Sequence, residues 1–330
     1  MSWRRDFYQI IATLGPAVDG KVMDLIKAGA TGFRLNCSHL TWTELSHWLV
    51  QLENGFRQKG DAMPVWLDLQ GTKLRVGKLT QPISLKTDDM VSFSFQYSQQ
   101  AKDIPLPHQW IFNVIASGDD IALDDGKITL KVVATEKNRF LAMVIHGGIL
   151  RSFKGFVLKN RSSEFQQVSD RDRTFIEQTL QLKFVGYAIS YLQTAEELNH
   201  FKQIASKKSI TAKIERKAAL DNLREIADMA DVCWLCRGDL GTNINLYELH
   251  RYEQQFSETM KTMNKPFLIA GQVLENMVNH SFPSRSEIAH LGYLMENGFT
   301  GVVLSDETAV GKYPLQTVEF CREYFDYLTA

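Results

Sequence analysis

Residues 209–216 read SITAKIER, a short apolar stretch typical of a buried strand that nevertheless contains two charged residues. Side chains alternate between the two faces of a strand, so Lys213 and Glu215 share one face. A buried ion pair alone is a poor source of stability, because both groups lose their hydration. The stretch therefore predicts a strand that ends in a polar site, where both charges find further partners.

Strand-forming and helical segments alternate on both sides of this stretch. The predicted strands, each followed by a helical pattern, occupy residues 7–15, 31–37, 63–69, 184–190, 209–215, 231–239, 265–271 and 301–307. Eight strands that are each followed by a helix favour an α/β fold, the (β/α)8 TIM barrel. A doubly wound open sheet is the competing layout, but no GxGxxG motif follows the first strand.

The alternation is interrupted after the third strand. Residues 71–152 contain short β-like runs with turn signals, such as DDGKITLKVVATEKNRFLAMVIHGG, and few helical patterns. We therefore expect a barrel formed by residues 1–70 and 153–330. Residues 71–152 are expected to form an inserted, all-β and barrel-like lid domain.

Composition excludes several classes of function. The 330 residues include 37 basic and 38 acidic side chains, a balance that gives no electrostatic case for nucleic acid or an anionic membrane. No apolar run could span a bilayer, and we find no signal peptide. Four cysteines suit a reducing, cytoplasmic location. Cys233 and Cys236 form a CxxC, but in a strand they would point to opposite faces, so we expect structural thiols.

Charged and polar side chains gather where the predicted strands end, although each alone is more often a surface or capping residue. The carboxyl ends of the strands form the active face of a (β/α)8 barrel, so we expect these side chains to meet. Burying so many charges is unfavourable unless a ligand lies between them. The residues concerned are Arg34, Asn36, Ser38, His39, Asp68, Lys73, Arg75, Lys213, Glu215, Arg237, Gly238, Asp239, Ser305, Glu307 and Thr308.

The chemistry of this set favours metal-assisted phosphoryl transfer. Glu215 and Asp239 are hard oxygen ligands on neighbouring predicted strands, and such ligands suit Mg²⁺. Lys213, Arg34 and Arg75 are cations suited to phosphate oxygens. A divalent cation, a lysine and arginines around one phosphate are the groups that this reaction needs.

Motifs along nearly the whole chain resemble the pyruvate kinase family. In order they are IIATLGPAVDG, AGATGFRLNCSH, WLDLQGTKLRVG, LDDGKITLKVV, GGILRSFKG, AKIER, CRGDLG, GQVLENM, PSRSE and LSDETAVGKYP. The resemblance implies a glycolytic phosphotransferase that converts phosphoenolpyruvate and ADP to pyruvate and ATP with Mg²⁺ or Mn²⁺.

The resemblance also implies roles for residues at matching positions. Glu215 and Asp239 would hold the divalent metal. The catalytic positions would be Lys213, Arg34, Arg75 and Ser305, and a monovalent-cation-like site would involve Asn36, Ser38, Asp68 and Lys73. The substrate would contact Arg34, Lys213, Gly238, Asp239 and Gly271, and the nucleotide would contact Pro16, His39, Arg75, Asp125 and Lys154. Arg285 would lie at a barrel–barrel homodimer contact.

At several positions the chain differs from the family pattern, and these differences lead to further expectations. Lys73 stands where K⁺-dependent members have a glutamate, and a fixed ammonium can replace a monovalent cation, so we expect activity without K⁺. Gly271 stands in place of a threonine near the substrate, which suggests weaker handling of enolpyruvate or room for a larger substrate. Gln193 and His290 replace an arginine and an acidic residue.

The chain stops at the last predicted barrel helix, so we expect no C-terminal regulatory domain, no regulation by sugar phosphates, and a dimer. Two alternatives remain open at this stage. One is a pyruvate kinase paralogue that acts on a different enol phosphate or 2-oxo acid in a specialised pathway. The other is a non-catalytic binding protein of the same fold.

Overall fold

The chain divides into two compact units. The computed structural model describes residues 8–38, 40–71, 74–95, 103–109, 111–124, 126–158 and 168–330. One unit comprises residues 1–72, 165–238 and 250–330, and the other comprises residues 73–164 and 239–249. The domain limits expected from the sequence, 71–152 for the insert, stay a prediction.

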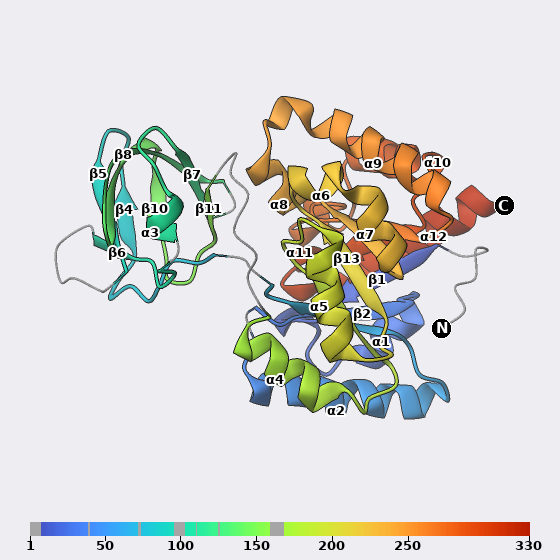
Figure 1. Ribbon diagram of the computed structural model, residues 1–330. Coiled ribbons are helices and arrows are strands. Elements are labelled where there is room, and N and C mark those ends of the chain that lie inside the picture. Colours follow the sequence, from blue (N-terminus) through green and yellow to red (C-terminus); the bar gives the residue numbers. More distant parts are fainter. Residues whose placement is uncertain are drawn as a thin grey trace. The chain divides into compact units, whose positions relative to one another are not determined.

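The first unit is a closed barrel of eight parallel strands surrounded by helices, which confirms the predicted fold (Figure 1). Around the barrel the strands follow the order β1-β16-β15-β14-β13-β12-β3-β2. Their bounds are β1 Gln9–Thr13, β2 Gly32–Asn36, β3 Val65–Leu69, β12 Val185–Ile189, β13 Ile210–Ile214, β14 Val232–Cys236, β15 Phe267–Ala270 and β16 Gly301–Leu304. Each predicted strand thus forms, and the insertion follows the third one.

Large side chains fill the barrel interior. Trp66 on β3 and Trp234 on β14 are buried, with ring centroids 5.7 Å apart, and they pack with apolar residues from other strands. Trp234 is the register partner of Lys213 on β13. The interior is therefore a packed core rather than a pore. Cys236 belongs to this interior cluster and Cys233 does not, as expected for residues three apart in a strand.

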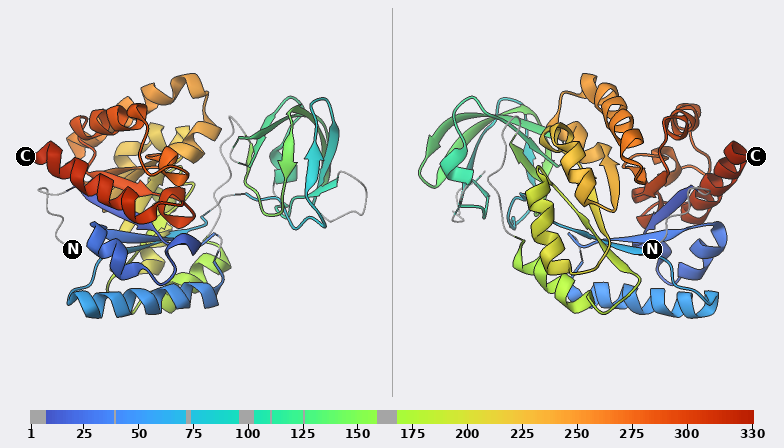
Figure 2. Two further views of the ribbon diagram at one scale, coloured as in Figure 1. Left: turned by 180° about the vertical axis from the view of Figure 1, so that it is seen from behind. Right: turned by 45° about the vertical axis from the view of Figure 1, so that its right-hand side comes forward.

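Helices enclose the barrel, and their ends follow capping rules. Thr41 and Ser284 each begin a helix with a capping box, and Ser169 accepts a hydrogen bond from the backbone N–H of Asp172. Figure 2 shows α2 and α4 side by side, where Trp42 contacts Phe175. The helices are α1 Val22–Ala28, α2 Trp42–Lys59, α4 Asp170–Thr179, α5 Ala195–Ala205, α6 Lys217–Asp221, α7 Leu223–Met229, α8 Arg237–Asn243, α9 Leu249–Met263, α10 Arg285–Glu296, α11 Asp306–Ala309 and α12 Pro314–Thr329, with 3-10 turns η1 Pro16–Val18, η2 Leu246–Glu248 and η3 Glu275–Val278.

The second unit is mainly β-structure. A six-stranded sheet of order β11-β7-β8-β9-β5-β6 and a two-stranded sheet of β10 and β4 enclose their own apolar core, in which Phe93 stacks on Phe140. The elements are β4 Ile83–Leu85, β5 Met90–Ser94, β6 Asp103–Pro105, α3 Ile111–Val114, β7 Asp120–Leu123, β8 Ile128–Glu136, β9 Arg139–His146, β10 Gly148–Leu150 and β11 Phe156–Leu158. The predicted β insert is confirmed, with the single-turn helix α3 added to it.

Candidate active site

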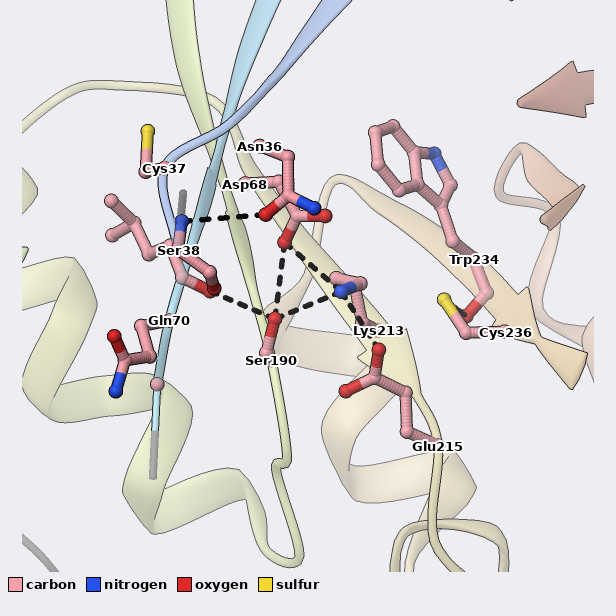
Figure 3. A network of polar contacts seen from close by, with 12 residues as sticks. Asn36, Cys37, Ser38, Asp68, Gln70, Ser190, Lys213, Glu215, Trp234 and Cys236 are labelled. Atoms are coloured by element: carbon pink, nitrogen blue, oxygen red, sulfur yellow. Dashed lines mark hydrogen bonds and ion pairs between the residues drawn. The ribbon is translucent and has the colours of Figure 1, made fainter. Parts of the chain in front are cut away.

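Buried charges meet at the carboxyl ends of the neighbouring strands β3, β12 and β13 (Figure 3). The Lys213 ammonium lies 2.7 Å from Glu215 Oε1 and 3.0 Å from Asp68 Oδ1. It also donates a hydrogen bond of 2.8 Å to Ser190 Oγ. Lys213 and Glu215 therefore share one face, and Lys213 has partners on three strand ends.

Arg34 in the middle of β2 completes this cluster. Its Nε and Nη2 atoms lie 2.7 and 2.6 Å from Asp68 Oδ2, and its Nη1 donates to Thr13 Oγ1 on β1. Asp68 thus neutralises two cations, Arg34 through one oxygen and Lys213 through the other. The Arg34 side chain keeps 13% of its surface exposed, so it borders both the buried cluster and the solvent.

Burial and charge act against each other in this cluster. Burial disfavours the charged form of Lys213, but the carboxylates of Asp68 and Glu215 outweigh it and raise the lysine pKa. Burial likewise opposes ionisation of Asp68, yet Lys213 and Arg34 hold its pKa below the ordinary value. The pKa of Arg34 is raised by Asp68 against the effect of burial. All three groups are therefore charged at neutral pH.

Glu215 is the candidate metal ligand on β13. Its side chain is fully buried, and Oε2 accepts a 2.8 Å hydrogen bond from the backbone N–H of Tyr191. Asp239, its predicted partner, lies in the first turn of α8, directly after β14, and groups with the second compact unit. Within the described residues no three His, Cys, Asp or Glu side chains form a metal-binding cluster. The pair of Glu215 and Asp239 stays a prediction.

The loop after β15 carries Gly271, where the sequence departs from the family. Gly271 has φ +86°, and a Cβ at this position would lie 3.2 Å from the backbone nitrogen of Gly238. Arg237 donates to the carbonyl oxygens of Gly271 and Gln272, and Gln272 itself has φ +52°. The backbone therefore adopts the left-handed conformation that glycine favours, and a larger residue at 271 would be strained.

The remaining predicted positions lie in several places. Asn36 Oδ1 accepts from the backbone N–H of Ser38 after β2, and Ser305 follows β16 and donates its backbone N–H to Glu307. Pro16 begins the turn η1, and Arg285 begins α10. In the second unit Arg75 donates to the carbonyl of Phe153, and Lys154 pairs with Asp124 at 2.7 Å. His39, Lys73 and Asp125 lie outside the described residues.

Sequence reasoning missed several residues of this region. Ser190 links Lys213 to β3, and the only sequence signal is a hydroxyl residue at the end of a predicted strand. The carboxylate of Asp172 accepts the backbone N–H groups of Gln70 and Gly71, where the chain leaves β3. Its place three residues after a capping serine indicated a helix start but not this contact.

A second, partly buried network supports the loop after β15. His290 lies 2.9 Å from Arg237 through Nδ1 and 2.8 Å from Glu253 through Nε2. His290 therefore joins α10 to α9 and to the arginine that holds Gly271. The replacement of an acidic residue by histidine at 290 has a structural role here.

A (β/α)8 barrel with an inserted β domain and clustered charges at the strand ends defines a class of α/β enzymes whose active sites lie at that face. The chain matches the pyruvate kinase barrel domain over residues 5–318. It belongs to the pyruvate kinase family, whose members are phosphotransferases.

Named relatives agree with this assignment. Pyruvate kinases of Agrobacterium vitis and Thermococcus litoralis are 30% and 31% identical over 94% of this chain. The chain spans 66% and 67% of the length of those two proteins. A crystal structure of a pyruvate kinase from Cryptosporidium parvum superposes with a TM-score of 0.88 at 23% identity, covering 97% of this chain and 68% of that one, and so supports the fold.

Proposed function

We propose that the protein transfers the phosphoryl group of phosphoenolpyruvate to ADP, with a divalent metal, giving pyruvate and ATP. The observation that carries the proposal is the cluster of Lys213, Glu215, Asp68 and Arg34 at the strand ends. Two cations and two buried carboxylates are held there before any ligand arrives. Preorganised charges of this kind are the main source of catalysis in phosphoryl transfer.

The residues fit a hard divalent cation. Carboxylate oxygens are the ligands that Mg²⁺ and Mn²⁺ prefer, and Glu215 offers a buried carboxylate in a cluster whose two cations are already paired with Asp68. With Asp239 from the start of α8, it would hold the ion. When bound, the ion would neutralise charge on the phosphate oxygens.

The reaction requires one bond exchange and one protonation. The bond from phosphorus to the enol oxygen of the substrate breaks, a bond forms to a β-phosphate oxygen of ADP, and the enolate takes a proton at its methylene carbon. Lys213 would stabilise the transferring phosphoryl group, and Arg34 would orient the substrate phosphate. Asp68 keeps both cations in place.

A coupled assay of pyruvate formation tests this proposal, with phosphoenolpyruvate, ADP and either Mg²⁺ or Mn²⁺. We expect turnover that requires the divalent ion and that changes less than about twofold when K⁺ is omitted, because Lys73 would supply a positive charge in place of that ion. Absence of pyruvate at high enzyme concentration would reject the proposal. Ligand-induced stabilisation without turnover would instead favour a binding protein of this fold.

A second candidate is a related reaction on a larger enol phosphate or 2-oxo acid. It is favoured by Gly271, which places no side chain beside Gly238 and has a backbone conformation suited to glycine. A screen of enol phosphates with ADP, and of 2-oxo acids with ATP, separates the two candidates. Exclusive turnover of phosphoenolpyruvate would exclude the second one.

We further propose a cytoplasmic homodimer that contacts through the Arg285 region. The family match motivates this proposal, because the resemblance places Arg285 at a barrel–barrel contact and four cysteines suit a reducing compartment. None of the helices in the described part of the chain has the length and apolar character needed to cross a membrane. Light scattering of the wild type and of Arg285→Glu tests the dimer, since a reversed charge in the contact should favour monomers.

A further inference from the structure

Ser190 occupies a central place in the buried cluster (Figure 3). Its hydroxyl accepts a 2.8 Å hydrogen bond from the Lys213 ammonium, and it lies 3.0 Å from Asp68 Oδ1 and 2.8 Å from the carbonyl oxygen of Leu69. A hydroxyl has one proton to donate and can accept in addition. Ser190 therefore acts as an acceptor for Lys213 while it donates to β3.

The backbone around Ser190 is closely constrained. Tyr191 has φ +63°, an unfavourable conformation for a residue with a side chain, and its N–H donates to Glu215 Oε2. The guanidinium of Arg216 lies 5.2 Å from the centre of the Tyr191 ring. On the other side, a Cβ at Gly71 would lie 2.2 Å from the Ser190 carbonyl oxygen. These contacts constrain the backbone that carries Ser190, and the hydrogen bonds of its hydroxyl orient the side chain.

One oxygen in the cluster has competing partners. Glu215 Oε1 contacts the Lys213 ammonium at 2.7 Å, and the same carboxylate is the candidate metal ligand. A divalent ion on Glu215 would repel an ammonium at that distance. The ammonium then depends on its other partners, which are Asp68 and Ser190.

We propose that Ser190 is a positioning residue that holds the Lys213 ammonium when Glu215 binds a divalent cation. This inference rests on the proposed function, because it assigns Glu215 to the metal. By giving the ammonium a neutral acceptor, Ser190 lowers the competition between Lys213 and the metal for Glu215. Ser190 thereby allows cation and ammonium to lie in one site.

A double-mutant cycle with Mn²⁺ binding tests the inference without any need for turnover. The variants are Ser190→Ala, Lys213→Met and their combination, with Mn²⁺ affinity measured by electron paramagnetic resonance. A hydrogen bond to a charged group contributes about 1.5–3 kcal/mol, so Ser190→Ala should weaken Mn²⁺ binding by about tenfold or more. In the Lys213→Met background the same change should have no effect, since no ammonium competes for Glu215.

Two controls accompany the cycle. Ser190→Thr keeps the hydroxyl and should keep Mn²⁺ affinity within about threefold of the wild type. If Ser190 only filled space, the affinity would not depend on whether the variant has a hydroxyl. Ser209→Ala removes a hydroxyl that has no hydrogen-bond partner among the described residues, directly before β13, and should leave affinity unchanged. Thermal unfolding of each variant checks that it is folded.

The outcomes separate the inference from the proposed function. Coupling in the cycle supports the positioning role even if the wild type shows no turnover of phosphoenolpyruvate, a result that would reject only the reaction. Where turnover is found, Ser190→Ala should lower kcat by tenfold to about a hundredfold with little change in the KM for ADP. Equal loss of Mn²⁺ affinity in both backgrounds, or a wild type that binds no Mn²⁺, would overturn the inference.

Discussion

At the scale of single residues, the alternation of side chains in SITAKIER was enough to predict that Lys213 and Glu215 meet. Arg34 and Asp68 were also predicted at the strand ends, and the structure places both in contact within the same cluster. Ser190 and Tyr191 could not be predicted. A serine at a strand end is common, and the identity of residue 191 as tyrosine does not indicate a positive φ. Their role follows only from three-dimensional distances.

Replacement of Asp68 tests how far the cluster depends on charge balance. Asp68→Asn would leave Lys213 and Arg34 buried with less neutralising charge, and breaking a buried pair of this kind costs about 3–5 kcal/mol. Chemical denaturation should show that loss in the free energy of unfolding. Asp19 is an exposed carboxylate paired with His47, so Asp19→Asn should cost less than about 1 kcal/mol. Equal costs for the two variants would contradict this account of the cluster.

The pH dependence of stability should report on Asp172. Burial raises its pKa from 3.8 to about 6, although the amides of Gln70 and Gly71 favour the charged form. The folded state therefore binds the proton more tightly than the unfolded state. This contribution to the free energy of unfolding, about 3 kcal/mol, is present below about pH 4 and is lost as pH rises through about 6.

Asp172→Asn removes this titration. Urea denaturation at about pH 4.5 and about pH 7 should show that the variant loses less stability with rising pH than the wild type does. Identical pH dependences in the two proteins would show that the carboxyl group at 172 does not titrate in this range.

At the scale of elements, most strands and helices of the barrel follow the apolar pattern of the sequence, and several helices begin at a capping serine or threonine. The helical pattern of residues 219–230, after the fifth predicted strand, predicts one helix, whereas the chain forms two, α6 and α7, which meet at Asn222. The Asn222 side chain donates to the carbonyls of Gln193 and Ala218, so it competes with regular helix hydrogen bonds. The partner Gln193 is distant in the sequence, and no local pattern could reveal it.

Glu307 joins the ends of β15 and β16, and its removal tests the loop that carries Gly271. Its carboxylate accepts the backbone N–H groups of Val273, Leu274 and Ser305 at 2.7–3.1 Å. Glu307→Ala would leave three donors without this acceptor, two of them buried, and we expect a loss of about 3 kcal/mol or more in the free energy of unfolding. Calorimetry against Glu319→Ala, an exposed glutamate on α12, provides the comparison. A melting temperature equal to that of the control would be inconsistent with this role.

At the scale of the whole molecule, the number of strands predicted the barrel. The interruption of the strand–helix alternation after the third strand predicted the inserted β domain. The sequence did not show that residues 239–249 group with the insert rather than with the barrel. That grouping depends on packing: a Cβ at Gly126 would lie 2.9 Å from the Thr242 side chain. Contacts between segments so distant in the sequence carry no local signal.

The central claim is that the charges buried at the barrel mouth serve metal-dependent phosphoryl transfer. The most direct measurement is the rate of pyruvate formation from phosphoenolpyruvate and ADP with Mg²⁺, for the wild type and for Lys213→Met of matched thermal stability. We predict turnover by the wild type and a loss of roughly a thousandfold in kcat for the variant, since the ammonium stabilises charge in the transition state. Equal rates for the two proteins, or no turnover by either, would contradict the claim that these buried charges serve phosphoryl transfer.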